Sequence, residues 1–387
     1  MGKIVRVLYD DQAFTMQHVG GVSKGICRIL EQMPPSIDMR FGVSHCNNVY
    51  LRESGLVPDL QPARTDWIAA RSKSYFPGKR TLFMAASRMG LVRSAEYYNR
   101  RLSVELLRGQ DFDVFHPTFF DDYFLRYLGG KPFVLTIHDM MPELFPDYFR
   151  KDDLQIVAKR KLIGLASAIA VPSHNTKKDL MDMLGVPEGR ITVIHRGGPP
   201  RETVTEPAIM PGDYFLFVGS RGEYKNFVGV LNDFSVFSPK YPDVRLVCVG
   251  TPFTPAEEGM INERNLSGRV IRKAADDAQL KNLYAHARAF IFPSRYEGFG
   301  LPVLESFAYG CPLLLNNRSC FPEVAGDAAL YFESDGGFSD LPEKMRQVLE
   351  WTPAERTAAV DRGYARLSCF SWERAAAQYA ELYSSLV

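Results

Sequence analysis

The 387-residue sequence has almost no net charge, no closely paired cysteines and no long apolar run. A formal net charge of +1 creates no overall field that would favour nucleic acid as a partner. The six cysteines form no CxxC pair and no other metal-ligand spacing, which is typical of reduced thiols in a reducing compartment. No stretch reaches 18 consecutive apolar residues, so no membrane-spanning helix is predicted. These absences favour a globular protein that is made and kept in the cytoplasm.

The residues that are present suffice for two hydrophobic cores, since 46% of them are apolar and the chain exceeds the usual length of one domain. Short apolar runs alternate with stretches of helical length. This rhythm predicts a parallel sheet covered by helices on both faces. The predicted strands of the first half are 5–9, 114–115, 133–137, 168–171 and 191–194, and its predicted helices include 23–32, 151–166 and 176–183.

The rhythm breaks at 196–207, which is rich in glycine and proline and is predicted to link two domains. It then restarts, with predicted strands at 214–218, 244–249, 271, 289–292 and 312–315 and predicted helices at 226–237, 277–286, 302–309 and from Ser371 to the end. We therefore expect an α/β protein with two doubly wound, Rossmann-like domains facing a central cleft. The domains are predicted at 1–200 and 205–370.

A predicted anion site follows the strand that ends at Phe292. A loop containing Gly298 and Gly300 leads there into a helix that opens near Pro302. The free N–H groups and positive end of a helix attract phosphate, and glycine lets phosphate approach the backbone.

Two carboxylates, Glu297 and Glu305, flank this loop and can accept hydrogen bonds from sugar hydroxyls. Glu305 alone is explained equally well by its place near a helix N-terminus. Its combination with Glu297 and the two glycines favours a ligand site.

A second loop follows the strand 214–218 and carries Gly219, Arg221 and Lys225. An arginine fork and a lysine point charge both suit a diphosphate. By themselves these cations would be an ordinary solvated loop, but their place in the same domain as Glu297 favours binding.

Two further features lie in the first half. Gly20 and Gly21 follow the first strand but do not form GxGxxG, so they do not predict a nicotinamide site. His138 lies just past a predicted buried strand, where histidine is often structural. Because both features follow strand ends, a functional role is favoured.

Together these residues resemble family 4 of the retaining glycosyltransferases, which have the GT-B fold. The most specific element is the E-x7-E motif of Glu297 and Glu305 within P-S-x-Y-E-G-F-G-L-P. Gly20-Gly21, the Ile-His-Asp around His138 and the closing Phe-Ser-Trp-Glu at 370–373 add to the resemblance. In this fold the last helix, 371–387 here, packs back on the N-terminal domain.

The resemblance implies roles for individual residues. Glu297 would contact the donor sugar, Glu305 the nucleotide ribose, and His138 the transferred sugar. The residues with an implied catalytic role are His138, Glu297, Arg221 and Lys225, and those implied to bind the donor are Gly20, Gly21, Gly219, Arg221, Lys225, Arg272, Lys273, Glu297, Gly298, Phe299, Gly300, Leu301 and Glu305. One departure matters, because Tyr224 stands where many members have arginine, so that Arg221 would have to supply the second cation.

A narrower resemblance is to enzymes that build bacterial surface polysaccharides. It rests on Y-D-D-Q-A-F at 9–14 and F-H-P-T at 115–118. It implies that Gln12, His116 and Thr118 lie near the acceptor, a glycan or a polyprenol-linked glycan.

The expected reaction moves a hexose from a GDP-, UDP- or dTDP-linked sugar to an acceptor hydroxyl. Charge develops on the leaving diphosphate, where fixed cations and helix N–H groups stabilise it. We therefore expect neither a metal nor a cofactor, and we expect the single DxD, Asp111 and Asp113, to be structural. Since no carboxylate nucleophile is evident, retention would require front-face attack by the acceptor hydroxyl.

Segment 69–109 is rich in arginine and lysine with interleaved apolar residues. It predicts either docking on an anionic membrane surface or an ordinary solvated helix face. Other functions also remain open. The main alternative is a non-catalytic or hydrolytic GT-B protein that binds sugar nucleotides; an epimerase, a phosphorylase or a dinucleotide oxidoreductase is less favoured.

Overall fold

A computed structural model describes residues 4–63, 94–149, 154–335 and 338–387. The chain divides into two compact units. The first comprises Met1–Pro172, Lys177–Ile194 and Trp372–Val387, and the second comprises Ser173–Thr176 and His195–Ser371. The main part of the second unit thus begins at His195, one residue before the predicted linker, and the C-terminal helix belongs to the first unit.

The first unit contains a parallel sheet in the order β2-β1-β3, which a bridge between Phe115 and Phe133 joins to the order β4-β5-β6. Its strands are β1 (Val5–Tyr9), β2 (Ile37–Phe41), β3 (Val114–His116), β4 (Val134–Thr136), β5 (Ala168–Val171) and β6 (Ile191–Val193). The order reverses between β1 and β3. Such a switch point is where doubly wound sheets bind ligands, outside the carboxyl ends of the strands.

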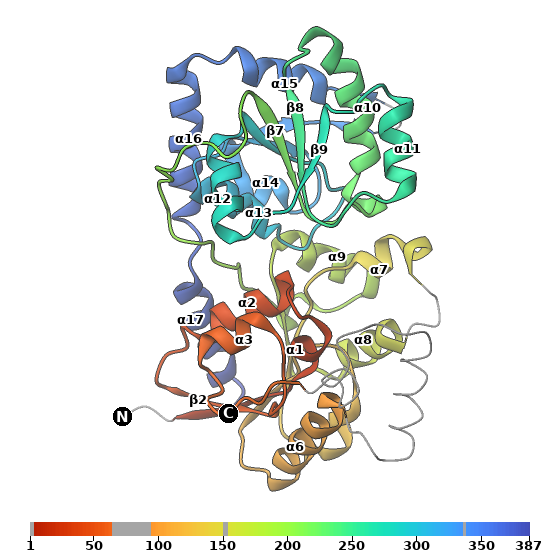
Figure 1. The fold of residues 1–387 in the computed structure, drawn as a ribbon. Coiled ribbons are helices and arrows are strands. Elements are labelled where there is room, and N and C mark those ends of the chain that lie inside the picture. The colour runs from red at the N-terminus through yellow and green to blue at the C-terminus, as the bar shows by residue number, and fades with distance from the viewer. Residues whose placement is uncertain (1–3, 64–93, 150–153, 336–337) are drawn as a thin grey trace, which may run out of the picture. The chain divides into compact units, whose positions relative to one another are not determined.

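Helices connect these strands. They are α1 (Gln12–Met16), α2 (Gly21–Leu30), α3 (Val49–Ser54), α6 (Ala95–Gly109), α7 (Met141–Leu144), α8 (Leu154–Leu165) and α9 (His174–Leu184). The last helix, α17 (Trp372–Ser384), packs against α2 and β1 and is drawn in blue beside α2 in Figure 1. Ala375, Ala376 and Tyr383 of α17 are buried, and the small alanines let the helix approach the sheet closely.

The second unit has a six-stranded sheet in the order β12-β11-β10-β7-β8-β9. The strands are β7 (Tyr214–Val218), β8 (Arg245–Val249), β9 (Val270–Lys273), β10 (Ala289–Phe292), β11 (Leu313–Asn316) and β12 (Leu330–Phe332), and all pair in parallel. This order is that of a dinucleotide-binding Rossmann sheet, and its switch point lies between β7 and β10.

The helices of the second unit cover both faces of this sheet. They are α10 (Phe227–Phe237), α11 (Pro255–Glu263), α12 (Asp277–His286), α13 (Leu301–Ala308), α14 (Phe321–Ala325), α15 (Leu341–Glu350) and α16 (Pro353–Leu367). Along β7, Leu216 belongs to one apolar cluster while Phe215 and Phe217 belong to the other. Burial on both faces explains why the strands read as continuous apolar runs.

Two predicted helix ends are confirmed by the local structure. Asp276 caps α12 and forms a capping box with Gln279, so two otherwise unpaired N–H groups are satisfied. Helix α13 has Pro302 in its first turn and is followed by Gly310 at φ +65°, a left-handed conformation that favours glycine.

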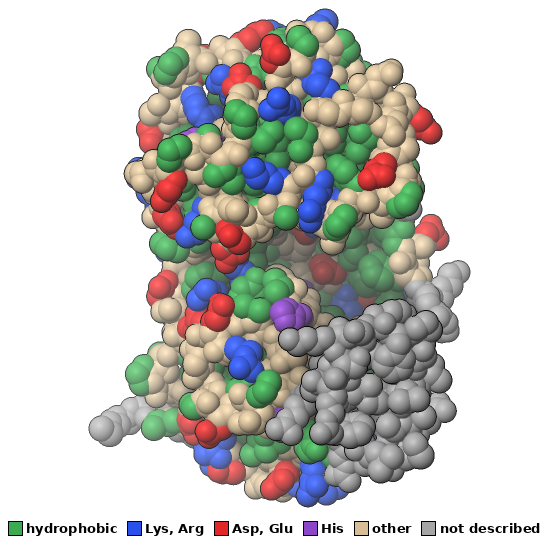
Figure 2. Space-filling view, viewed as in Figure 1, with side chains coloured by type: hydrophobic (Ala, Val, Ile, Leu, Met, Phe, Trp, Pro, Cys, Tyr) green, Lys and Arg blue, Asp and Glu red, His purple; other side chains and the backbone are tan. Residues whose placement is uncertain are grey.

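The distribution of charged side chains on the surface agrees with the near-zero net charge of the chain (Figure 2). On the face drawn in Figure 2, the coloured basic and acidic side chains are interspersed, so no large field of one sign covers it. In the described ranges, no helix has both the length and the apolar character needed to cross a membrane.

Candidate donor-binding site

The loops after β7 and β10 meet at the switch point of the second unit. The backbone N–H of Arg295 donates to the carbonyl of Tyr224 at 2.8 Å, which ties the two loops together. The Lys225 ammonium forms an ion pair with the Glu297 carboxylate, although the two residues are 72 positions apart. The Ser319 hydroxyl donates to the Glu297 carbonyl at 2.8 Å and accepts from its N–H at 3.2 Å. Lys225 and Glu297, which the sequence placed in one domain, therefore stand side by side, and their binding of a donor stays a prediction.

The ion pair is largely shielded from water, with side-chain exposures of 18% for Lys225 and 17% for Glu297. Burial alone would lower the pKa of Lys225, but the Glu297 charge outweighs burial and the pKa is raised. The ammonium also lies 5.5 Å from the centroid of the Phe292 ring, at the end of β10. Lys225 thus keeps a positive charge where the chain turns toward α13.

Gly300 shapes the helix N-terminus in this loop. It is the N-cap of α13 with φ +85°, and a Cβ on it would lie 3.1 Å from the Phe321 ring. Glycine is required there because other residues rarely adopt this conformation. The Gly298 carbonyl accepts a hydrogen bond from the Ser173 hydroxyl at 2.7 Å, which fixes the preceding turn. The loop that carries Phe299, Gly300 and Leu301 is therefore held rigidly at the helix end that attracts anions.

Glu305 lies one turn into α13 and is half-buried. Burial raises the pKa values of Tyr284 and Tyr309, and the charge of Glu305 raises both further, which locates its carboxylate near these rings. The two glutamates of the E-x7-E motif thus flank the α13 N-terminus, one before it and one after it.

Arg221 makes a different set of contacts from the one expected. Its Nε donates to Glu257 at 2.6 Å, and its Nη2 donates to the carbonyls of Thr251 and Pro252 at 3.0 and 2.9 Å. Only 3% of its side chain is exposed, and its Nη1 is buried without a hydrogen-bond partner. Sequence reasoning missed Glu257, which neutralises this arginine. A contact between Arg221 and a diphosphate stays a prediction, and Lys225 is the cation that reaches Glu297.

The backbone at the ends of β7 and β8 is closely packed. Gly219 has φ +117°, and a Cβ on Gly250 would lie 2.6 Å from the Gly219 carbonyl oxygen. The side chains of Arg272 and Lys273 donate to the carbonyls of Gly250 and Ile209, both at 3.1 Å. Both side chains are therefore engaged with backbone at this edge of the sheet, and their role toward a nucleotide base stays a prediction.

In the first unit, a buried carboxylate organises the switch point between β1 and β3. Asp10 Oδ1 accepts from the N–H and hydroxyl of Thr118, both at 2.8 Å, while Oδ2 accepts from Gln12 at 2.6 Å and from Tyr123 at 3.3 Å. Burial raises the pKa of Asp10. Gln12 and Thr118 do lie together, because both bond the carboxylate of Asp10. Sequence reasoning missed Asp10, although its position directly after a buried strand was an available signal.

His116 has partners on both ring nitrogens. Nδ1 lies 2.7 Å from the Tyr383 hydroxyl of α17, and Nε2 lies 2.9 Å from the Thr136 hydroxyl. Burial lowers the pKa of His116 to about 3, so the ring is neutral at physiological pH. The ring connects β3 to the C-terminal helix, and its predicted contact with an acceptor is not tested by these bonds.

His138 follows β4, is buried, and stacks at 6.4 Å on the Phe119 ring. The next residue, Asp139, accepts a hydrogen bond from the Lys159 ammonium on its carbonyl at 2.9 Å. Lys159 also forms a buried ion pair with Glu143 at 2.8 Å. The segment that carries His138 is therefore fixed by a buried cation.

The remaining predicted residues are placed as follows. Gly20 precedes α2, and a Cβ on it would collide with the Gln17 side chain, whereas Gly21 faces open space. Asp113 accepts from Arg6 at 2.8 Å, which lowers its pKa to about 2, and Asp111 pairs with Arg6 and Arg40. This is the structural use expected of the DxD.

Most of the basic segment 69–109 lies outside the described residues. Its described part includes α6, where Arg100 pairs with Asp121 and lies 3.6 Å from the Tyr123 ring centroid. Tyr97 and Tyr98 of the same helix are about two-fifths exposed. These contacts do not decide between a membrane surface and a solvated face.

Comparison with known proteins agrees with this architecture. The chain matches the family model "Glycosyl transferases group 1" over residues 205–365 and the model "Glycosyltransferase Family 4" over residues 63–200. A sucrose-phosphate synthase from Thermosynechococcus elongatus has the same fold, with a TM-score of 0.71 and 17% identity over 99% of both chains. The fold and the switch-point site define a glycosyltransferase of the GT-B class.

Two curated relatives are both mannosyltransferases. The "O-antigen chain mannosyltransferase B" of Escherichia coli is 28% identical over 272 residues, which cover 65% of this chain and 70% of the relative. The "GDP-mannose:cellobiosyl-diphosphopolyprenol alpha-mannosyltransferase" of Xanthomonas oryzae pv. oryzae is 25% identical over 259 residues, covering 65% of this chain and 66% of the relative. The chain belongs to glycosyltransferase family 4.

Proposed function

We propose that this enzyme transfers a mannosyl residue from GDP-mannose to a hydroxyl of a polyprenol-linked glycan during synthesis of a bacterial surface polysaccharide. The observation that carries the proposal is the shielded Lys225–Glu297 pair at the β7/β10 switch point. The names of the two relatives support mannose as the sugar, GDP as the nucleotide and a lipid-linked acceptor.

In the proposed reaction, the donor diphosphate lies at the N-terminus of α13. The Lys225 ammonium and the backbone N–H groups of Phe299, Gly300 and Leu301 stabilise the charge that develops as the anomeric C–O bond breaks. These groups are fixed before the donor binds, since hydrogen bonds hold the loop, so little reorganisation accompanies the reaction. Their positive charge is the basis for proposing transfer without a metal or another cofactor.

Two carboxylates select the donor in this proposal. Glu297 accepts hydrogen bonds from hydroxyls of the transferred sugar, and Glu305 accepts them from the ribose. When the diphosphate arrives, Lys225 exchanges part of its contact with Glu297 for the phosphate and so frees Glu297 for the sugar. The acceptor hydroxyl attacks from the side that the diphosphate leaves, which retains the anomeric configuration, and the leaving phosphate takes the hydroxyl proton.

We further propose that the enzyme acts at the cytoplasmic face of the membrane. The structure forms no disulfide among the six cysteines, all of which lie in the described residues; five of them are buried and Cys369 is exposed, which fits a reducing compartment. The arginines and exposed tyrosines of α6 suit an anionic headgroup region. Co-sedimentation with vesicles of phosphatidylglycerol, but not with vesicles of phosphatidylcholine alone, is the expected result.

A transfer assay tests the proposal directly. The purified chain is incubated with a polyprenol-diphosphate-linked oligosaccharide and with GDP-mannose, UDP-glucose or dTDP-rhamnose, in the presence of EDTA. Mannosylated product with α linkage from GDP-mannose alone is expected. Donor binding with hydrolysis but no transfer would instead favour the alternative, a hydrolytic sugar-nucleotide-binding protein.

A further inference from the structure

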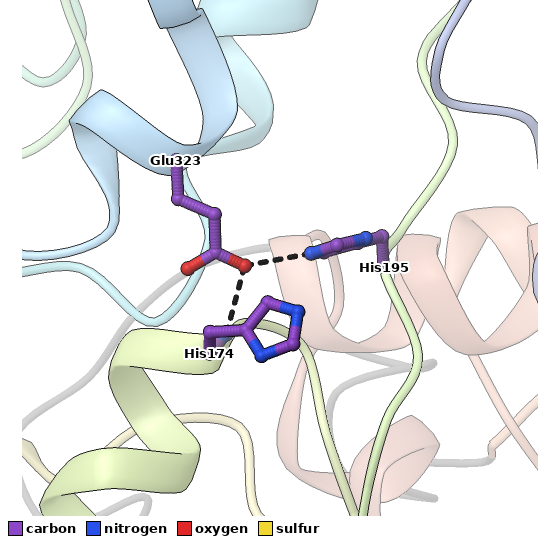
Figure 3. A group of neighbouring side chains, drawn as sticks. All are labelled: His174, His195 and Glu323. Atoms are coloured by element: carbon purple, nitrogen blue, oxygen red, sulfur yellow. Dashed lines mark hydrogen bonds and ion pairs between the residues drawn. The ribbon is translucent and has the colours of Figure 1, made fainter.

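Three metal-ligating side chains come together in the second unit. His174 begins α9, His195 follows β6, and Glu323 lies in α14. One ligand atom of each lies within 4.8 Å of the other two. Figure 3 shows the Glu323 carboxylate between the two histidines, with the His174 ring directed toward the same space.

The Glu323 carboxylate is fixed by three donors. Oε1 accepts from the backbone N–H of His174 at 2.7 Å and lies 2.6 Å from His195 Nε2, while Oε2 accepts from the N–H of Asn175 at 3.1 Å. Both carboxylate oxygens are thus held in place beside the two histidines.

The His195 ring is also held in place. It lies 6.1 Å from the Phe299 ring and 5.6 Å from the Phe370 ring, centroid to centroid. Its orientation is therefore fixed by packing as well as by Glu323. A pre-oriented histidine and a carboxylate held by hydrogen bonds form most of a metal site before any ion arrives.

The position of Glu323 is explained by its role as a cap at the N-terminus of α9, but that role does not account for the His174 imidazole beside it. The capping bond uses only the backbone N–H of that residue. The side chain of His174 is exposed, and its ring lies 5.7 Å from the His195 ring at an angle of 66°. An exposed side chain rotates freely, so His174 can complete the set at little cost.

We propose that His174, His195 and Glu323 bind a divalent transition metal of the Zn²⁺ class. Two imidazoles and one carboxylate are a ligand set that Zn²⁺ prefers, with a fourth position left for water. Tetrahedral bonds of about 2.0–2.2 Å place the ligand atoms about 3.4 Å from one another. His174 therefore has to rotate inward, while His195 Nε2 and Glu323 Oε1, which are 2.6 Å apart, have to separate slightly. His195 Nε2 then bonds the ion through its lone pair in place of its hydrogen bond to Glu323, and the neutral ring carries its proton on Nδ1.

The site is linked to the donor loop through residues 173–176. Ser173 of this segment donates to the Gly298 carbonyl at 2.7 Å, and His195 packs against Phe299. The ion takes no part in the proposed transfer step, which relies on Lys225 and helix N–H groups. It would instead stiffen the segment on which the donor loop rests.

Metal binding is measurable without any donor, so the test is separate from that of the proposed function. The full chain without an affinity tag is stripped with EDTA and dialysed, then titrated with Zn²⁺ by calorimetry. Titration with Co²⁺ gives visible absorption bands that report the ligand geometry. One ion per chain is expected, with Co²⁺ bands typical of four-coordinate geometry.

Three variants and one control decide the outcome. His174→Ala, His195→Ala and Glu323→Gln are each expected to weaken Zn²⁺ binding about tenfold or more, and Glu323→Gln keeps an acceptor for the helix cap. His286→Ala removes a half-buried histidine elsewhere, which contacts the Glu206 carbonyl, and should leave affinity unchanged. Absence of a saturable 1:1 site, or equal affinity in all four folded variants, overturns the proposal.

Discussion

At the scale of single residues, only one of the two predicted cations contacts Glu297. Lys225 contacts Glu297, whereas Arg221 is neutralised by Glu257 and the neighbouring carbonyls. The two residues should therefore respond differently to substitution. Lys225 is expected to act on catalysis, and Arg221 on stability.

Lys225→Ala should reduce kcat about 10²- to 10³-fold, because removal of one fixed donor to a developing negative charge has that cost. Lys225→Arg should recover part of the rate. Steady-state transfer from GDP-mannose measures both. Lys240→Ala, which removes an exposed lysine after α10, serves as the matched control and should retain full activity. A Lys225→Ala enzyme with normal kcat would contradict the proposed stabilisation of the leaving group.

Arg221→Ala should lower the free energy of unfolding by about 3 kcal/mol, since it leaves the shielded Glu257 carboxylate without its partner. The loss should shrink when Glu257→Gln is added, because no unpaired charge then remains. Urea unfolding of the single and double variants measures this coupling. If Arg221→Ala instead leaves stability unchanged but abolishes transfer, Arg221 serves the diphosphate as the sequence predicted.

His116 contributes a pH dependence of stability. The pKa of His116 falls from about 6.5 in the unfolded chain to about 3 in the folded protein. Between pH 6.5 and pH 3 the imidazole is therefore protonated in the unfolded chain but not in the folded protein. Stability from this group is complete above pH 6.5 and is lost as pH falls toward 3. Each pH unit in this range costs about 1.4 kcal/mol of the free energy of unfolding, so acidification to pH 5 should cost about 2 kcal/mol.

The parent and His116→Asn are compared by urea unfolding at pH 7.5 and pH 5. Asp10 and Asp11 have raised pKa values and oppose the effect of His116 in both proteins, so the difference between the two proteins isolates the histidine. The parent should lose about 2 kcal/mol more than the variant on acidification. Equal losses would contradict the assigned neutral state of His116.

At the scale of elements, α13 and its N-cap position the donor loop. Gly300→Ala places a Cβ in a left-handed conformation and 3.1 Å from Phe321, so a loss of about 1–2 kcal/mol is expected. Weaker GDP binding should accompany the loss. Gly259→Ala in α11 is the matched control, because nothing lies within 4 Å of its Cβ; it should stabilise by about 0.5–1 kcal/mol. Thermal unfolding and GDP titration of both variants measure these effects.

Elements buried on both faces could be predicted from the sequence, and those with solvated faces could not. The bounds of β5, β7 and β10 follow directly from their uninterrupted apolar runs. Strand β2 was missed because IDMRF carries two charges, and only Ile37 is fully buried in it. Helix α16 was missed for the same reason, since five charged residues interrupt the apolar positions of PAERTAAVDRGYARL.

The same limit applies to the sites. The Lys225–Glu297 contact was predictable because β7 and β10 are neighbours at a switch point, where loop ends meet. The partner Glu257 of Arg221 was not, because it lies in α11, a separate element that shares no motif with Arg221. Asp10 was overlooked although it directly follows β1, the neighbour of β3 at the other switch point. Local sequence gives residue types at strand ends, and tertiary packing decides which of them pair.

At the scale of the whole molecule, the chain contains two Rossmann-like units, but the donor nucleotide should act on only one of them. Apart from Gly20 and Gly21, whose role only the resemblance implies, every group proposed to hold the diphosphate lies in the second unit, at 219–226 and 293–301. Ligand at 100 times its Kd stabilises a fold by about 2.7 kcal/mol. GDP should therefore slow hydrogen exchange in these two loops and in α13, while the strands of the first unit exchange as before. Exchange measured by mass spectrometry with GDP and with guanosine as the control separates the diphosphate from the base: protection of the two loops by guanosine alone would show that the diphosphate is not what they bind.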